Sequence, residues 1–242
     1  MANFKSRRSP GLRLFVYRQL VDFSLANRLP NLEDLTSKRG LANVMRMRKP
    51  DEVTSWVLHQ NGFHWQENNP LRDKIKAHFQ IWQSGRITQN TSILARLRSS
   101  SNGANKFCIG IEFDGNFEGM PGCDNFFKPE KYGRSHVTPA QVMAARRLMR
   151  EVHAMLNEQS PGTLRAVFAH RQWGVSKTGK PNRPICPGHE IWTHIGEWAK
   201  VEFGYTDGGP DWCYRVKGKD HGMPIPSEWR GVPMADVEMA VA

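Results

Sequence analysis

The sequence predicts an α/β protein with a single domain and terminal extensions. Two short apolar runs, Val53 to Leu58 and Leu164 to Ala169, have the length and composition of buried strands. A long helix is expected between them, because Thr138-Pro139-Ala140-Gln141 combines a capping residue, a first-turn proline and a glutamine that completes a capping box. With 242 residues, 39% of them hydrophobic, the chain can fill one substantial core.

Two helices follow from apolar residues that recur at helical spacing. The first begins at Thr138, stops before Ser160-Pro161-Gly162, and has an apolar face formed by Val142, Ala145, Met149, Val152 and Leu156. The second runs from about Glu190 to Phe203 and ends at Gly204, since glycine commonly terminates helices. These helices alternate with the predicted strands, as in α/β proteins.

The segment between the first strand and the first helix contains further elements. Ala77 to Trp82 and Arg86 to Gln89 flank Ser84-Gly85, a pattern typical of a β-hairpin. Ser99 to Asn105 is small and polar, so we expect a loop that leads into a strand from Phe107 to Phe113. Gly115 to Ser135 is expected to form a long surface insertion that lines a groove.

The two ends of the chain differ in composition from the middle. Residues 1–50 are rich in Arg and Lys and are expected to form a partly helical extension, with a helix that ends near Pro30. Residues 51–204 form the expected main domain, in which Asn69-Pro70 opens a short helix. Residues 205–242 are rich in Gly and Pro, and we expect them to wrap the surface with little regular structure.

The charge and the cysteines limit the possible partners and compartments. The formal net charge of +11 favours polyanionic partners, but the basic residues are spread along the chain, so we expect no dedicated nucleic-acid partner. The apolar run Leu14 to Tyr17 is too short for a signal peptide or a transmembrane segment. The four cysteines could pair, but an odd three remain if Cys186 binds a metal, so we expect no full disulfide framework and synthesis in a reducing cytoplasm.

Three residues have the types and positions of metal ligands. His59 and His170 lie at or directly after the two predicted buried strands, and Cys186 follows His170 by sixteen residues. Neighbouring strand ends bring their side chains to one edge of a sheet. Two histidines and a cysteine leave one open position on a tetrahedral zinc, which is what a hydrolytic site needs. Two alternatives remain: ordinary structural histidines, or a Cys186 thiol nucleophile activated by His170.

Glu112 is the candidate general base. It lies inside the otherwise apolar strand Phe107 to Phe113, where a carboxylate is costly unless it faces a polar cleft. The alternative is a structural salt bridge with one of the many arginines.

Five motifs in one order resemble a known family. They are Val57-Leu58-His59-Gln60, Ile109-Gly110-Ile111-Glu112-Phe113-Asp114-Gly115, Thr138-Pro139-Ala140-Gln141, Ala169-His170-Arg171 and Cys186-Pro187-Gly188. Their order and spacing resemble the zinc-dependent N-acetylmuramoyl-L-alanine amidases related to peptidoglycan recognition proteins. The resemblance covers roughly residues 50–203. The tail is similar to that of a bacterial and phage subgroup.

The resemblance implies a central mixed β-sheet flanked by helices, with a shallow groove over one Zn²⁺ per chain. It implies His59, His170 and Cys186 as the zinc ligands and Glu112 as the group that assists the zinc-bound water. Asn105 matches an asparagine that can hydrogen-bond the substrate, although an ordinary loop asparagine is an equal alternative. Related enzymes often carry a lysine where this chain has Pro184, so Lys180 or Arg183 is expected to take its place.

The function implied is hydrolysis of the amide between N-acetylmuramic acid and L-alanine in peptidoglycan. Without a signal peptide, the protein would reach the cell wall as a phage lysin released after membrane failure, as a virion component or as the cargo of an injection system. The alternative is a non-catalytic peptidoglycan-binding module, used structurally in a phage particle. A basic nucleic-acid binder would have no reason to carry this ordered set of zinc ligands.

Overall fold

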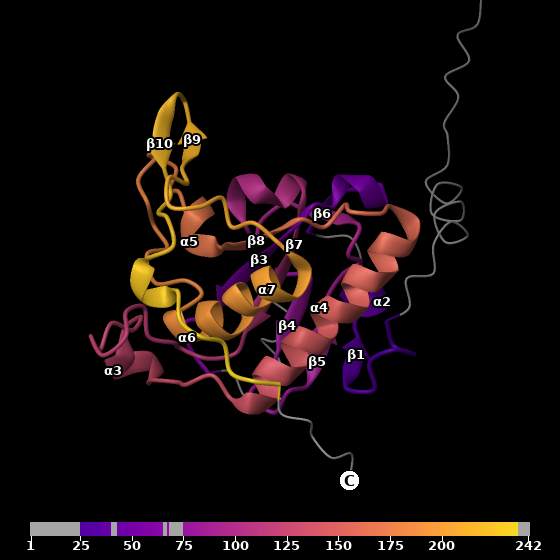
Figure 1. The fold of residues 1–242 in the computed structure, drawn as a ribbon, viewed down its shortest axis with the longest axis horizontal. Coiled ribbons are helices and arrows are strands. Elements are labelled where there is room, and N and C mark those ends of the chain that lie inside the picture. The colour runs from indigo at the N-terminus through magenta and orange to yellow at the C-terminus, as the bar shows by residue number, and fades with distance from the viewer. Residues whose placement is uncertain (1–24, 40–42, 65–66, 68–74, 237–242) are drawn as a thin grey trace, which may run out of the picture.

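The computed structural model describes residues 25–39, 43–64, 67 and 75–236 and has a mixed six-stranded sheet at its centre (Figure 1). All neighbouring strands are parallel except β4 and β5, which form the expected hairpin. The predicted α/β fold with a central mixed sheet is therefore confirmed. In spatial order the strands are β1 (Leu32–Asp34), β5 (Ile87–Gln89), β4 (Phe79–Ile81), β7 (Cys108–Phe113), β3 (Ser55–Gln60) and β8 (Ala166–Ala169).

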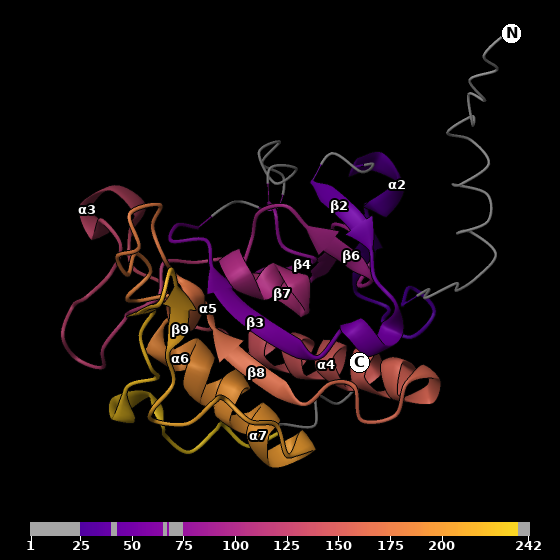
Figure 2. The same cartoon turned by 90° about the horizontal axis from the view of Figure 1, so that it is seen from above.

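Helices cover one face of this sheet (Figure 2). The longest is α4 (Pro139–Gln159), which starts at the predicted capping box of Thr138 and Gln141. A second helical stretch consists of α6 (His189–Ile191), a π-helical segment (Trp192–Glu197) and α7 (Trp198–Phe203), and it ends at Gly204 with φ +69°. Both predicted helices are confirmed. They pack on the main core with the strand residues Trp56, Leu58, Ile109, Ile111 and Phe113.

The opposite face is covered by shorter elements. A 3₁₀ helix (Asn102–Lys106) follows the small ribbon of β2 (Val44–Met47) and β6 (Ala95–Leu97), and α5 (His170–Trp173) follows β8. A second apolar cluster on this face consists of Val57, Ala104, Cys108, Ala166, Phe168 and Trp173. The expected loop Ser99 to Asn105 thus ends in a 3₁₀ helix, because Phe107 N–H bonds back to the carbonyl of Ala104.

The expectation of little regular structure in the tail is wrong in part. Strands β9 (Tyr214–Val216) and β10 (Lys219–His221) form an antiparallel hairpin, and a 3₁₀ turn (Ser227–Trp229) follows. The two turn residues between the strands, Lys217 and Gly218, have φ of +53° and +76°. Positive φ at both central residues is the geometry of the two-residue turns that join strands, and Lys-Gly was the available signal.

The N-terminal segment contributes to the central sheet. β1 pairs with β5 in parallel, and α2 (Thr36–Arg39) and β2 follow it. The first predicted strand begins two residues late, at Ser55, because residues 50–52 form a 3₁₀ turn. The helix predicted before Pro30 lies largely outside the described residues, as does the one at Asn69-Pro70. The proposed domain limits at residues 50 and 204 stay a prediction.

The edge of the sheet at β8 is covered by the start of the tail. The amide of Val167 donates to the carbonyl of Thr206 over 3.0 Å, and the amide of Thr206 donates to the carbonyl of Arg165 over 3.0 Å. These bonds form a single parallel bridge between Ala166 and Thr206. The backbone of β8 is therefore paired on both sides.

Candidate metal centre and cleft

Three side chains that could hold a metal ion meet at the carboxyl ends of β3 and β8. His59 is the penultimate residue of β3, His170 is the first residue of α5 directly after β8, and Cys186 lies on the loop that follows α5. Their ligand atoms lie within 4.8 Å of one another, and all three residues are buried. The structure thus brings together the three residues that the sequence predicted as ligands.

The distances within this cluster suit zinc. Cys186 Sγ lies 3.6 Å from His170 Nδ1. Ligand atoms at the usual Zn–S and Zn–N distances of about 2.3 and about 2.1 Å lie about 3.6 Å apart at a tetrahedral angle. His59 Nε2 contacts Ser101 Oγ over 2.7 Å, so Nδ1 is the ring atom available to a metal. Two imidazoles and one thiolate are a common zinc donor set.

Burial sets the protonation states of the three candidate ligands. It lowers the pKa of His59 to about 3 and that of His170 well below its usual range, so both rings are neutral, as metal ligation requires. It raises the pKa of the Cys186 thiol to about 12. A thiol with such a pKa is a poor free nucleophile, whereas a bound cation would deprotonate it. Burial of the thiol, together with the ligand distances, therefore favours the metal site over the thiol alternative.

The loop that carries Cys186 is held by residues that follow the two histidines in sequence. The amide of Gln60 donates to Cys186 Sγ over 3.4 Å, and its side-chain Nε2 donates to the carbonyl of Ile185 over 2.9 Å. The amide of Arg171 donates to the carbonyl of Cys186 over 3.0 Å. Neither residue was assigned a role from the sequence. The available signals were that each directly follows a candidate ligand and belongs to one of the five motifs.

Glu112 lies beside the cluster on the neighbouring strand. Its register partner in the parallel pair of β3 and β7 is His59, so both side chains leave the sheet on the same face. Burial raises the pKa of Glu112 to about 7, and the Arg183 guanidinium opposes this shift. Among the described residues Glu112 has no ion-pair partner, which disfavours a structural salt bridge.

A cleft of about 1100 Å³ opens over these groups. His59, His170, Cys186 and Glu112 all line it. The insertion Gly115 to Ser135 borders the cleft with residues 125–128, just before α3 (Pro129–Tyr132), as predicted. Among the described residues that line the cleft, one is acidic and four are cationic, namely Lys76, Arg98, Lys128 and Arg183, so this lining suits a substrate with negative charge.

The three predicted substrate-binding residues occupy different positions. Asn105 lines the cleft, but its Oδ1 accepts the amide of Ser101 over 2.8 Å, which fixes the serine that contacts His59. Arg183 also lines the cleft, and its charge affects the pKa of all three candidate ligands and of Glu112. Lys180 is exposed and is not among the residues that line the cleft. Their contacts with substrate stay predictions.

The solved structures that are similar to this chain include an amidase, an endolysin and a peptidoglycan recognition protein. The amidase LysCS from Clostridium intestinale URNW is 18% identical, with a TM-score of 0.46, and the match covers 74% of this chain and 98% of that one. The Ph2119 endolysin from Thermus scotoductus MAT2119 bacteriophage Ph2119 is 15% identical (TM-score 0.38; 65% and 91%). Drosophila peptidoglycan recognition protein SA is 19% identical (TM-score 0.42; 68% and 91%).

None of the curated proteins compared with the chain matches it. Within the described residues, no helix has the length and apolar character needed to span a membrane. The model of one protein family, described as N-acetylmuramoyl-L-alanine amidase, matches residues 49–189. This segment contains β3, β7 and β8 together with all three candidate ligands and Glu112. The chain therefore belongs to the N-acetylmuramoyl-L-alanine amidase family.

Proposed function

We propose that this protein is a zinc-dependent amidase that cleaves the bond between N-acetylmuramic acid and L-alanine in peptidoglycan. The observation that carries the proposal is the buried cluster of His59, His170 and Cys186 next to Glu112 in one cleft. Membership of the amidase family supports the same reaction. The cationic lining of the cleft suits stem peptides, which carry free carboxylates.

In this mechanism His59, His170 and Cys186 would hold one zinc ion at the cleft. A bound zinc lowers the pKa of water to about 7 and polarises a carbonyl oxygen. The Glu112 carboxylate accepts the proton of the attacking water, whose oxygen bonds to the lactyl carbonyl carbon. Glu112 then donates this proton to the nitrogen of L-alanine as the C–N bond breaks. The Arg183 guanidinium offers a positive charge to the developing oxyanion.

The proposed partner is peptidoglycan, so the protein acts on the cell wall after its release or delivery. The net charge of +11 favours association with an anionic wall. A phage lysin, a virion component and an injected protein all satisfy this requirement.

The products of digestion test the assignment. Purified peptidoglycan treated with the zinc-loaded protein should release stem peptides that begin with L-alanine and leave glycan strands with lactyl carboxylates. Mass spectrometry distinguishes this from an endopeptidase, which leaves L-alanine on the sugar, and from a glycosidase, which creates new reducing ends. The Glu112→Gln variant is the control. Binding to the wall without any product would instead identify a peptidoglycan-binding module.

A further inference from the structure

The loop that carries Cys186 needs support from outside itself. Residues 174–188 contain no strand or helix, and their one β-bridge joins Val175 to Pro181. A ligand on a loop holds its position only where neighbouring groups fix the backbone around it. Gln60 provides this support from β3, through its bonds to Ile185 and Cys186.

Arg171 supports the same loop from α5. Its amide donates to the carbonyl of Cys186, and its Nη1 donates to the carbonyl of Pro184 over 2.6 Å. The two bonds bracket Ile185 and set the backbone on both sides of it. Because Arg171 directly follows His170, they also fix the cysteine loop relative to the second histidine.

The guanidinium of Arg171 is itself held by the C-terminal strap, which we define as residues 222–236. Its carbon lies 4.8 Å from the centre of the Trp229 ring, a cation–π distance. Trp229 is fully buried; its Nε1 donates to the carbonyl of Gly119, and its carbonyl accepts from Thr193 Oγ1 over 2.8 Å. The ring thus has a fixed place beneath the arginine.

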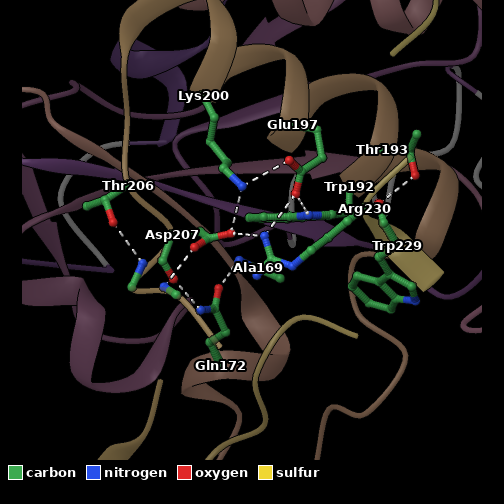
Figure 3. A network of polar contacts seen from close by, with 12 residues as sticks. Ala169, Gln172, Trp192, Thr193, Glu197, Lys200, Thr206, Asp207, Trp229 and Arg230 are labelled. Atoms are coloured by element: carbon green, nitrogen blue, oxygen red, sulfur yellow. Dashed lines mark hydrogen bonds and ion pairs between the residues drawn. The ribbon is translucent and has the colours of Figure 1, made fainter. Parts of the chain in front are cut away.

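A charged network anchors the strap next to Trp229 (Figure 3). Arg230 Nη1 lies 2.6 Å from Asp207 Oδ2 and 3.3 Å from Glu197 Oε1, and Lys200 Nζ contacts the same two carboxylates. The carbonyl of Asp207 accepts from the side chain of Gln172, the residue after Arg171. The network therefore ties the strap and the metal-bearing end of α5 to one framework.

From these contacts we propose that Arg171 and Trp229 are positioning residues for Cys186, so that the C-terminal strap is part of the metal centre. The proposal rests on the proposed function, because it takes Cys186 as a metal ligand. Trp229 lies beyond residue 189, where the family match ends. The strap therefore contributes the contact between Trp229 and Arg171, which involves a residue outside the matched segment.

Zinc affinity tests this proposal without an activity assay. Arg171→Met removes the bond to Pro184 and the cation–π contact, and Trp229→Leu removes the ring. Each should raise the zinc dissociation constant by about 10-fold or more, the lower end of what second-sphere changes produce. Competition with a chromophoric chelator measures this constant. In the Co²⁺-loaded variants the thiolate charge-transfer band should weaken or shift, since Cys186 is displaced.

Two conservative variants and one control separate positioning from general stability. Arg171→Lys and Trp229→Phe keep the charge and the aromatic ring, and they should stay closer to the wild-type zinc affinity. Trp82→Leu is the matched control for Trp229→Leu, because Trp82 is also buried and its Nε1 donates to Thr88 Oγ1 over 2.7 Å in the β4–β5 hairpin, without a hydrogen bond to the strap residues that the structure describes. It should lower the melting temperature and leave the zinc constant unchanged.

The double variant Arg171→Met, Trp229→Leu should bind zinc about as weakly as Arg171→Met alone, because the ring acts through the arginine. If Trp229→Leu does not fold, the zinc dissociation constants of Arg171→Met and Trp229→Phe test the proposal. Wild-type zinc constants and Co²⁺ spectra in Arg171→Met would overturn the inference and leave the proposed function intact. A wild-type protein that binds no zinc would overturn both.

Discussion

Both faces of β3 are buried, but the side chains on the two faces have different roles. Trp56 and Leu58 point into the core under α4, whereas Val57 and His59 point toward the second face, where the cleft lies. Leu58 is fully buried among apolar side chains, and its burial stabilises the fold. His59 is only 4% exposed, and its burial disfavours the charged ring. One strand thus carries both stability and chemistry by simple alternation.

Exchanging the neighbours Leu58 and His59 for alanine should separate these contributions most strongly. Leu58→Ala should lower the free energy of unfolding by about 2–5 kcal/mol, the usual effect of a buried cavity, while the protein keeps its zinc. His59→Ala should lose zinc and reduce amidase activity to background, because a candidate ligand is missing. Urea unfolding and elemental analysis provide the two measurements. Full zinc retention in a His59→Ala, His170→Ala double variant would refute the assigned metal centre.

Glu112 extends the comparison to the neighbouring strand. Glu112→Gln should keep the fold and the zinc but lower kcat by about 100-fold or more, the usual contribution of a positioned base. Its strand neighbour Ile111 points into the core, so Ile111→Val should cost about 0.5–1.5 kcal/mol of stability and leave kcat nearly unchanged. Steady-state kinetics on a peptidoglycan fragment measure the first effect. Near-normal turnover in Glu112→Gln would assign the base to another group.

The pH profile should separate the two candidate cations. A general base must be deprotonated, so kcat/KM should rise as the pH increases through the Glu112 pKa of about 7. The Arg183 guanidinium lowers this pKa, so Arg183→Met should move the rise to higher pH. Lys180→Met should leave it in place, because Lys180 lies outside the cleft. If the rise in kcat/KM moved to the same extent in both variants, Arg183 would not be closer to Glu112 in its electrostatic effect than Lys180.

A buried histidine outside the metal cluster is expected to affect stability at acidic pH without taking part in catalysis. His78 is 1% exposed; its Nδ1 accepts from the amide of Gly110, and its Nε2 contacts the carbonyl of Ala95. Burial, aided by Arg48, lowers its pKa from 6.5 to about 3. Its neutral form thus contributes stability above about pH 6.5 that is lost as the pH falls toward 3.

His78→Gln should therefore reduce the acid dependence of the unfolding free energy by up to about 1.4 kcal/mol per pH unit in this range. Urea unfolding at a series of pH values measures the slope. His59 and His170 act in the same direction, and bound zinc would keep their rings deprotonated in the folded protein, so their part of the slope should persist when zinc is added. An unchanged slope in His78→Gln would show that folding does not lower the pKa of this histidine.

Periodicity and local motifs were sufficient for much of the fold. The capping box at Thr138 and the apolar stripe of α4 are local signals, and so are the Ser84-Gly85 hairpin and the apolar run of β8. The three candidate ligands could be found because each lies at or just after such an element, or in a motif of the family. Strand alternation then explains why Glu112 and His59 share a face.

The remaining features depend on contacts between distant segments. β1 has three residues and pairs with β5 across more than fifty positions, which no local pattern predicts. Gln60 and Arg171 act through backbone carbonyls of a loop without regular structure. Trp229 belongs to the tail that is similar to that of a bacterial and phage subgroup, but its place under Arg171 follows only from the path of the strap.

The bridge at Thr206 has a consequence for self-association. β8 has the sequence Ala-Val-Phe-Ala and ends one side of the sheet, so its bare backbone would be a template for a strand from another molecule. The hydrogen bonds of Thr206 with Arg165 and Val167 already pair backbone groups of this edge. A fragment cut at residue 189, where the family match ends, would lose this cover and present an apolar edge to its neighbours. Aggregation of such a fragment would then reflect the unpaired edge of β8, although the fragment contains all three candidate ligands and Glu112.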